Sequence, residues 1–597
     1  MPVRSHFQLL SEKYTSKIFE IQDQIQYFLD SKSPADWDKA DELTNKLANG
    51  KGFDTEIERQ LIIIWKAQLN ELKQTASPSH TMSLVDEGIA LTYKEFDHQS
   101  FEGNMLIFGE AKLLHIYALA LSREGKISEA ITLLRRIQKG ISLLPEDDHD
   151  KEKQLAPILL SLSNLLMLKG KYGEALKVCL LGNSSSTERN EGKYMPDFLY
   201  NMARCNGSLG NTVECHRLFQ LSYFCYVLMR KMDQANQLKC YAKKQYNVEL
   251  NTYGVENLVF EELDTLVRHG ASVERENIGL FISALRQEEG ISQDELWDGI
   301  CGQSTFSRIE AGKRKGKIFC LEAIMQRLGR DINKYFATFP SIDDFMDKQT
   351  RNDVISRLAS LDFEVAAKLL EKLKGDRKSY KSGVGLQFIK MSEATIFANQ
   401  NVKGYSSPKY LEMLENALKV TMSKFDENRA GNYRLSYYEV SIINQMAIHY
   451  CESGKTRQGL RLFERLIDSM NCYYIDEKEK IRMYTTVLYN YSKYLGLTGR
   501  FEEALEVVKE GEILELRHRR LTLLPSFAIN HAYNLLELGL KEQSVPYFAL
   551  SYYGSIAFEE EYNYPVIATY VKERFGITFD YLPIGLGEPM LLGATSS

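Results

Sequence analysis

The stretch LTGRFEEALEVV, from Leu497 to Val508, has the pattern of a turn between two helices. Apolar residues recur three and four positions apart on both sides of it, which is the period of an amphipathic helix. Gly499 suits the left-handed conformation that often ends a helix. A small residue, Ser492, lies seven positions before this glycine, and Ala504 lies five positions after it. Small residues at these points let two antiparallel helices approach closely, so the stretch predicts a helical hairpin.

The same grid of a small residue, a glycine and a second small residue occurs six times in the chain. The copies are Ala118, Gly125 and Ala130; Ser163, Gly170 and Ala175; Ala203, Gly210 and Cys215; Ala447, Gly454 and Gly459; Ser492, Gly499 and Ala504; and Ala532, Gly539 and Ser544. This spacing is typical of tetratricopeptide (TPR) hairpins. Proline is scarce and strand-like alternation is nearly absent, so we expect an all-α fold.

The repeats fall into two sets separated by a constant offset of 329 residues. Gly125, Gly170 and Gly210 become Gly454, Gly499 and Gly539. The offset also aligns FQLSY (219–223) with FALSY (548–552), and Asn201 with Asn530. A generic repeat would not keep such details, so we infer an internal duplication of a TPR-like α-solenoid module. The offset also aligns Phe336 with Phe7, so the first copy begins where a domain preceding it would have ended.

The segment between the two copies, 277–336, predicts a compact bundle of short helices. Its apolar positions are Ile278, Phe281, Ile282, Leu285, Leu296, Phe306, Ile309, Leu321, Ile324, Met325 and Leu328. Ser292 and Ser304 are candidate N-caps that would open helices near Gln293 and Thr305. A short glycine-containing turn separates these two helices, as in a helix-turn-helix.

This segment resembles the Cro/repressor-type helix-turn-helix and, within that class, the Rgg- and PlcR-type peptide-pheromone regulators, the RRNPP family. Eleven residues match their motif: Gln293, Leu296, Ile300, Cys301, Gln303, Ser304, Ser307, Arg308, Ile309, Glu310 and Gly312. Two departures are Phe306, where a smaller aliphatic residue is usual, and GKIF (316–319), which replaces a proline-containing helix entry. The resemblance implies a transcriptional regulator that reads promoter DNA and whose repeats dimerise and bind a short signalling peptide.

We therefore divide the chain into four parts. Residues 1–270 form an N-terminal TPR-like module without its own helix-turn-helix, and residues 274–338 form the DNA-binding domain. Residues 339–582 form a C-terminal TPR-like module, and residues 583–597 form a flexible tail.

A recognition helix enters the major groove with its N-terminal residues facing the base edges. The candidate DNA-binding residues are Gln293, Gln303, Ser304, Thr305, Ser307, Arg308, Lys313, Arg314, Lys315 and Lys317. Arg308 could contact guanine, Gln293 could contact phosphate, and the basic loop would contact the backbone of any sequence. Glu310 is expected to brace the fold. A basic loop alone is typical of a solvated surface; its attachment to the full motif favours DNA.

Five asparagines on the repeat grid are candidate peptide ligands: Asn164, Asn201, Asn444, Asn490 and Asn530. The resemblance implies such a role, because an amide supplies both the donor and the acceptor that an extended peptide requires. Asparagine is also common on polar helix faces, so a surface role is the competing interpretation.

The remaining features exclude several classes of protein. A formal net charge of -6 means that any DNA-binding surface must be local. The nine cysteines are scattered, there is no secretory h-region, and the longest apolar runs fall short of the ~20 residues that span a bilayer. We expect a cytoplasmic protein without metal or cofactor that is not an enzyme. SGKT (453–456) imitates part of a phosphate loop, but no strand precedes it, and we interpret it as a repeat turn.

Two questions of assembly and function stay open at this stage. The two arrays could pair within one chain. Each chain has only one helix-turn-helix, so a palindromic operator would still require a homodimer, which we expect. The alternative function is that of a Rap-type repeat scaffold that acts on a partner protein and not on DNA. Sequence-selective, salt-dependent DNA binding would separate the two functions.

Overall fold

The computed structural model describes residues 21, 24–29, 33–49, 56–94, 96–98, 106, 108–142, 149–188, 192–260, 278–314, 316–330, 332, 342–376, 378–474, 477–518, 520–558 and 563–579. Helices dominate these residues, and none of them forms a strand. The expected all-α fold is therefore confirmed. The predicted tail, 583–597, and Lys315 lie outside the described residues.

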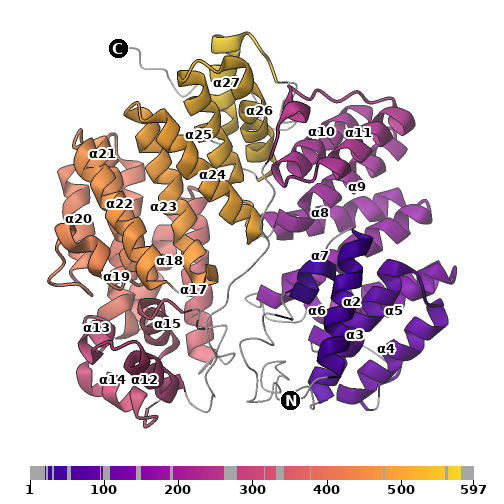
Figure 1. The fold of residues 1–597 in the computed structure, drawn as a ribbon, viewed down its shortest axis with the longest axis horizontal. Coiled ribbons are helices and arrows are strands. Elements are labelled where there is room, and N and C mark those ends of the chain that lie inside the picture. Colours follow the sequence, from indigo (N-terminus) through magenta and orange to yellow (C-terminus); the bar gives the residue numbers. More distant parts are fainter. Residues whose placement is uncertain are drawn as a thin grey trace.

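The N-terminal module is an array of antiparallel helices that forms one arm of the molecule (Figure 1). Its α-helices are α2 (Pro34–Ala48), α3 (Glu56–Lys73), α4 (Pro78–Thr92), α5 (Phe108–Arg123), α6 (Ile127–Ser142), α7 (His149–Leu168), α8 (Tyr172–Glu188), α9 (Met195–Ser208), α10 (Thr212–Leu228) and α11 (Met232–Tyr246). Two short 3-10 helices, η2 (Gly192–Tyr194) and η3 (Val255–Asn257), precede α9 and follow α11.

Four short helices of the central segment lie at the far end of the other arm (Figure 1). They are α12 (Ile278–Glu288), α13 (Gln293–Trp297), α14 (Gln303–Glu310) and α15 (Ile318–Arg327), and we call them the reader. Of the apolar residues expected in its core, all except the half-buried Ile278 are buried. Phe306 is fully buried, so the bundle accommodates its larger ring.

The C-terminal module continues this second arm. Its helices are α17 (Ile342–Ala359), α18 (Phe363–Asp376), η4 (Lys378–Tyr380), α19 (Gly383–Gln400), η5 (Gly404–Ser406), α20 (Pro408–Leu418), η6 (Glu427–Asn432), α21 (Tyr437–Glu452), α22 (Thr456–Tyr473), α23 (Glu477–Leu497), α24 (Phe501–Arg517), α25 (Leu524–Glu537), α26 (Lys541–Ala557) and α27 (Asn563–Phe575). Its apolar core is continuous with that of the reader, which packs directly on this module.

The duplication is visible helix by helix. Helices α8, α9 and α10 begin and end 329 residues before α24, α25 and α26. The six turn glycines all have φ between +70° and +84°, which explains why glycine recurs at these turns. A finer detail is also repeated: a Cβ on Gly182 would overlap the buried Phe198 ring, and a Cβ on Gly511 would overlap Phe527 in the same way. The offset inferred from the sequence is therefore a structural repeat.

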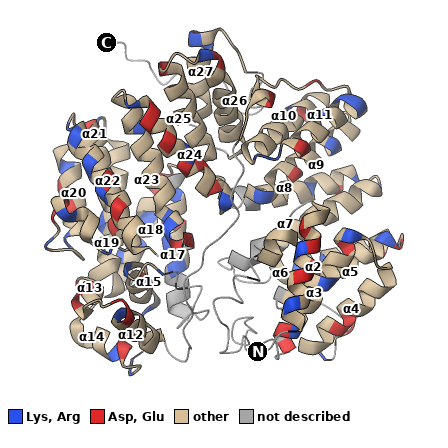
Figure 2. Ribbon diagram, in the orientation of Figure 1, with Lys and Arg blue, Asp and Glu red and all other residues tan. Residues whose placement is uncertain are grey.

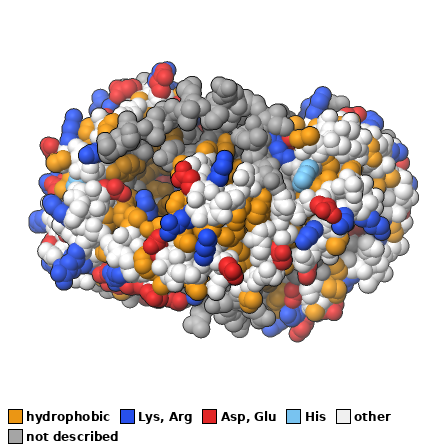
Figure 3. Space-filling model, turned by 90° about the horizontal axis from the view of Figure 1, so that it is seen from above, with side chains coloured by type: hydrophobic (Ala, Val, Ile, Leu, Met, Phe, Trp, Pro, Cys, Tyr) orange, Lys and Arg blue, Asp and Glu red, His pale blue; other side chains and the backbone are white. Residues whose placement is uncertain are grey.

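The two modules meet where α10 lies against α26, at the junction of the two arms (Figure 1). One apolar core runs from α3 in the first module across this contact to α27. The view from above shows hydrophobic side chains gathered toward the middle, with charged side chains scattered over both lobes (Figure 3).

None of the helices in the described part of the chain is long and apolar enough to cross a membrane. Within the same residues, no cluster of three or more His, Cys, Asp or Glu side chains could hold a metal ion.

Candidate functional site

The helix-turn-helix consists of α13, the turn after it and α14. Ser292 caps α13 in a reciprocal capping box: Glu295 N–H lies 3.4 Å from Ser292 Oγ, and Ser292 N–H donates to Glu295 Oε2 at 2.8 Å. Gly299, with φ of +74°, turns the chain beside the backbone of Thr421, where a Cβ would overlap main-chain atoms. The turn is therefore shaped against the C-terminal module.

The expected N-cap of the second helix is corrected by the structure. Helix α14 begins at Gln303 and its N-cap is Gly302, so Ser304 lies inside the first turn. The carbonyl of Gly302 accepts the N–H groups of Thr305 and Phe306 at 2.9 and 3.0 Å. Ser304 was predicted because serine favours caps, but the extended backbone of Gly302 starts the helix two residues earlier.

Apart from Gln293, which begins α13, the described residues predicted to bind DNA lie on α14 and the loop after it. Gln303, Ser304 and Arg308 are exposed, and Thr305 and Ser307 are half-buried. In the loop, Lys313, Arg314 and Lys317 are exposed, and Arg314 Nη1 donates to Thr305 Oγ1 at 3.2 Å. This bond folds the basic loop toward the start of α14. Acidic and basic residues are interspersed over both modules, so DNA contact would depend on this local patch (Figure 2).

Glu310 joins three helices of the reader. Its carboxylate, 6% exposed, accepts hydrogen bonds from Arg286 Nε on α12 at 2.6 Å and from Gln293 Nε2 at the start of α13. The expectation that Glu310 braces the fold agrees with these contacts. Gln293, expected at a phosphate, points its amide toward Glu310 in this structure.

Arg327, at the end of α15, fastens the reader to the C-terminal module. The residue is 4% exposed, and its Nη2 lies 2.6 Å from Oε1 of Glu439, which is fully buried on α21. Its Nη1 donates to the carbonyl of Asp298, in the turn before α14, at 2.9 Å. One guanidinium therefore ties the helix-turn-helix to the repeat helices.

The partners of Glu439 keep its carboxylate charged. Ser436 N–H and Thr421 Oγ1 both donate to it at 2.7 Å. Burial by itself would raise the pKa of Glu439, but the Arg327 guanidinium and these hydrogen bonds hold it below its ordinary value. Glu439 lies three residues after Ser436, the spacing of a capping box, but this local pattern does not point to Arg327, which is 112 residues away, so the sequence alone did not reveal the pair.

The five predicted peptide ligands form bridges between neighbouring hairpins. Asn201 Nδ2 donates to Ser163 Oγ at 3.0 Å and to Asn164 Oδ1 at 2.9 Å. In the second module Asn530 Nδ2 donates to Ser492 Oγ at 3.0 Å.

Asn490 Nδ2 lies 3.4 Å from Asn444 Oδ1. Asn201, Asn444 and Asn530 are buried, Asn490 is half-buried and Asn164 is exposed. The structure gives these amides a role in spacing the helices; their role as peptide ligands stays a prediction.

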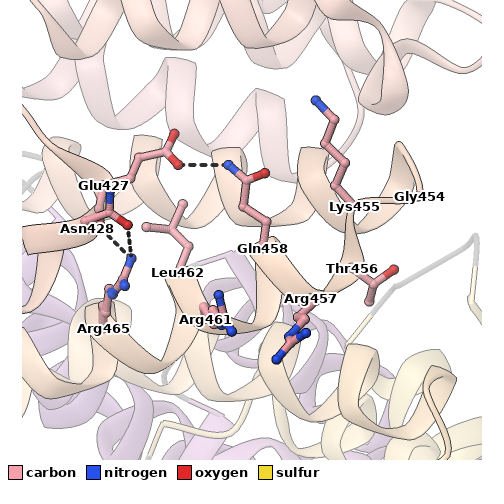
Figure 4. A pocket seen from close by; sticks show the side chains of 10 residues that line it. All are labelled: Glu427, Asn428, Gly454, Lys455, Thr456, Arg457, Gln458, Arg461, Leu462 and Arg465. Atoms are coloured by element: carbon pink, nitrogen blue, oxygen red, sulfur yellow. Dashed lines mark hydrogen bonds between the residues drawn. The ribbon is translucent and has the colours of Figure 1, made fainter.

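The SGKT stretch is the turn between α21 and α22, as expected from the repeat grid, with Gly454 at φ +81°. A cavity of about 520 Å³ opens beside it, lined mainly by η6 and the first turns of α22. Figure 4 shows that Glu427 is engaged by Gln458, at 3.0 Å, and Asn428 by Arg465, while Arg457 and Arg461 project from α22. The cavity lacks the glycine-rich backbone cradle of a phosphate loop.

Residues 411–546 match the model of the RNPP family C-terminal domain. This part of the chain is similar to the RNPP C-terminal domain. It begins within α20, contains α21–α25 and ends within α26. The resemblance drawn from the reader is thus confirmed by a match that lies outside the reader. No curated protein sequence matches the chain.

Solved structures with similar helical arrays are also found. PlcR of Bacillus thuringiensis, in complex with the peptide PapR7 and DNA, is 21% identical, with 49% of this chain and 99% of PlcR covered and a TM-score of 0.33. Its apo form is 20% identical, with 49% and 98% covered and a TM-score of 0.30. TPR-like repeats of a Podosopora anserina kinesin light chain are 16% identical, with 38% and 96% covered and a TM-score of 0.25. TM-scores this low do not establish a shared whole-chain fold.

Proposed function

We propose that the chain is a DNA-binding transcriptional regulator whose reader is α12–α15 and whose activity is set by a short signalling peptide bound to its repeats. The observation that carries this proposal is the two-sided character of α14. One face is buried through Phe306 and Ile309, and the other presents Gln303, Ser304 and Arg308 to solvent beside the basic loop. The peptide is proposed because the module that holds the reader contains the segment similar to the RNPP C-terminal domain.

The domain limits drawn from the sequence, at 1–270, 274–338, 339–582 and 583–597, stay predictions. A cytoplasmic location, a non-enzymatic role and the named DNA- and peptide-binding residues also stay predictions. The homodimer expected from the sequence is untested by a structure of one chain, and the contact between the two modules described below offers an alternative to it.

DNA binding is tested by fluorescence anisotropy with labelled promoter fragments, including the region upstream of the protein's own gene. A guanine contact from Arg308 predicts that Arg308→Ala lowers affinity for the preferred fragment by about 1–3 kcal/mol and reduces discrimination. The matched control, Lys313→Ala, should weaken all fragments alike and lower the salt slope by about 1. Absence of preference for any fragment would favour the scaffold function, in which the repeats bind a partner protein.

Peptide binding is tested by mass spectrometry of small molecules that co-purify with the full chain. A short peptide retained by the wild type and lost from Asn490→Ala would support peptide binding at the asparagines of the repeats. Retention of the same peptide by the variant would remove Asn490 from the site.

A further inference from the structure

The contact between α10 and α26 has the geometry of a subunit interface of a symmetric dimer. The two helices are equivalent under the 329-residue offset, and each lies against the other. Phe224 and Tyr553 are themselves equivalent, and their rings stack with centroids 4.2 Å apart and planes 14° from parallel. In an interface with two-fold symmetry a residue meets its own counterpart only at the axis. The contact is therefore isologous, but it is formed within one chain.

The packing around this pair is repeated on both sides. Ser222 Oγ donates to the carbonyl of Pro196 at 2.7 Å, and Ser551 Oγ donates to that of Pro525 at 2.7 Å. A Cβ on Gly554 would lie 2.7 Å from Leu228 Cδ1, so the helices approach closely. A cavity of only about 10 Å³ remains between residues of η2, α9, α10 and the α24–α26 region. The two helices therefore pack closely at this contact.

Beside the axis the symmetry is broken by an ionic cluster. Arg230, at the end of α10, has its Nη2 3.5 Å from Glu512 Oε2 on α24. Glu512 Oε1 lies 3.2 Å from His531 Nδ1, and the His531 ring stacks on Tyr547 with centroids 3.7 Å apart. The equivalents of Arg230, Glu512, His531 and Tyr547 under the offset are Glu559, Asn183, Met202 and Leu218. The Arg230–Glu512 contact is the part of the cluster that joins the two modules, and the residue types at the equivalent positions, Glu559 and Asn183, cannot form an ion pair.

This asymmetry disfavours pairing of like modules from two chains. An α26–α26 contact of the same geometry would leave Glu512 without an arginine partner, because the sequence position equivalent to Arg230 holds a glutamate, Glu559. An α10–α10 contact would place Arg230 opposite Asn183, which cannot neutralise it. The intramolecular pairing also benefits from the high effective concentration of two tethered modules.

We propose that the α10–α26 contact takes the place of the subunit interface, so that the chain is a monomer with a built-in dimer contact and one reader. Resting on the proposed function, this deepens it: one chain occupies one half-site, and its operator lacks two-fold symmetry. The pairing surface expected to serve a homodimer is already occupied within the chain.

The oligomeric state is measured by light scattering coupled to size exclusion on the full chain, without DNA or peptide, across a wide dilution series. The mass of one chain at every concentration is expected, and the mass of two chains would overturn the proposal. Selection from a random duplex pool should then enrich a motif without a palindrome, bound by one chain. A palindromic motif bound by two chains would also overturn it. A monomer that enriches no sequence would support internal pairing and contradict the DNA-reading function.

Charge reversal tests the selectivity of the contact. Arg230→Glu should increase hydrogen exchange in α10 and α26 at least several-fold while exchange in the reader is unchanged. The double variant Arg230→Glu with Glu512→Arg should restore protection. Glu502→Arg, at an exposed position on the same helix as Glu512, is the matched control. Unchanged exchange in Arg230→Glu, or failure of the double variant to restore it, would refute the role of the ionic cluster.

Discussion

Replacing Arg327 by Met should be among the most damaging single changes in the C-terminal half. The methionine keeps much of the side-chain volume but removes the only cation in hydrogen-bonding contact with Glu439 among the described residues. Removing one partner of a buried pair typically costs about 3–5 kcal/mol, because the remaining charge is uncompensated. The lost bond to the Asp298 carbonyl adds about 1 kcal/mol. The hydrogen bonds from Ser436 and Thr421 remain and offset part of this cost, so we expect a total of about 3–5 kcal/mol.

The assay is urea unfolding combined with hydrogen exchange of the reader peptides. Arg357→Met on α17 is the matched control, because its pair with Asp362 is exposed and should contribute less than about 1 kcal/mol. The double variant Arg327→Met with Glu439→Leu should recover much of the loss, since it leaves no unpaired charge. A single variant as stable as the control, with reader exchange unchanged, would refute the view that this pair fastens the reader.

Three further outcomes are expected. Acid should remove the stabilisation that the Glu439 carboxylate contributes. The pKa of Glu439 in the folded protein lies below the ordinary value of 4.5, so this stabilisation is present above pH 4.5 and is lost as the pH falls through the folded pKa. Urea unfolding between pH 7 and 3 should therefore show the difference in stability between the wild type and Arg327→Met shrinking as the pH falls. Gly182→Ala should destabilise by about 1–3 kcal/mol through overlap with Phe198, whereas Gly173→Ala on the same helix, with open space around it, should be neutral or slightly stabilising in thermal unfolding. Asn530→Ala should cost about 1–3 kcal/mol in thermal unfolding by removing the bridge to Ser492, and a wild-type melting temperature would contradict its spacing role.

Much of the fold follows from local pattern. The glycine grid places six turns because each requires a positive φ, and the reader's apolar spacing identifies its core because short amphipathic helices must bury one face. The duplication is readable because the offset preserves residues such as Asn201 and Asn530 that no repeat consensus demands.

The features of the site that the sequence did not predict depend on contacts between segments that are distant in the chain. Arg327 and Glu439 find each other only when α15 lies on α21. The grid asparagines were expected to face a ligand, yet whether an amide meets a groove or a neighbouring helix is decided by packing. One signal was present in the sequence: Leu218–Leu228 of α10 is apolar around much of its circumference and is buried throughout, as expected of a helix covered on several sides.

The Phe224–Tyr553 stack also bears on how such a chain can diverge. In a homodimer, a residue on the axis faces itself, so every mutation there is made twice and an ion pair can never form across it. After fusion of two copies, each ring can change alone, and one is now phenylalanine and the other tyrosine. Off the axis, Arg230 and Glu512 form a contact without a counterpart of opposite charge, because the equivalent positions hold Glu559 and Asn183. With both copies in one chain, each half of this surface can change independently of the other.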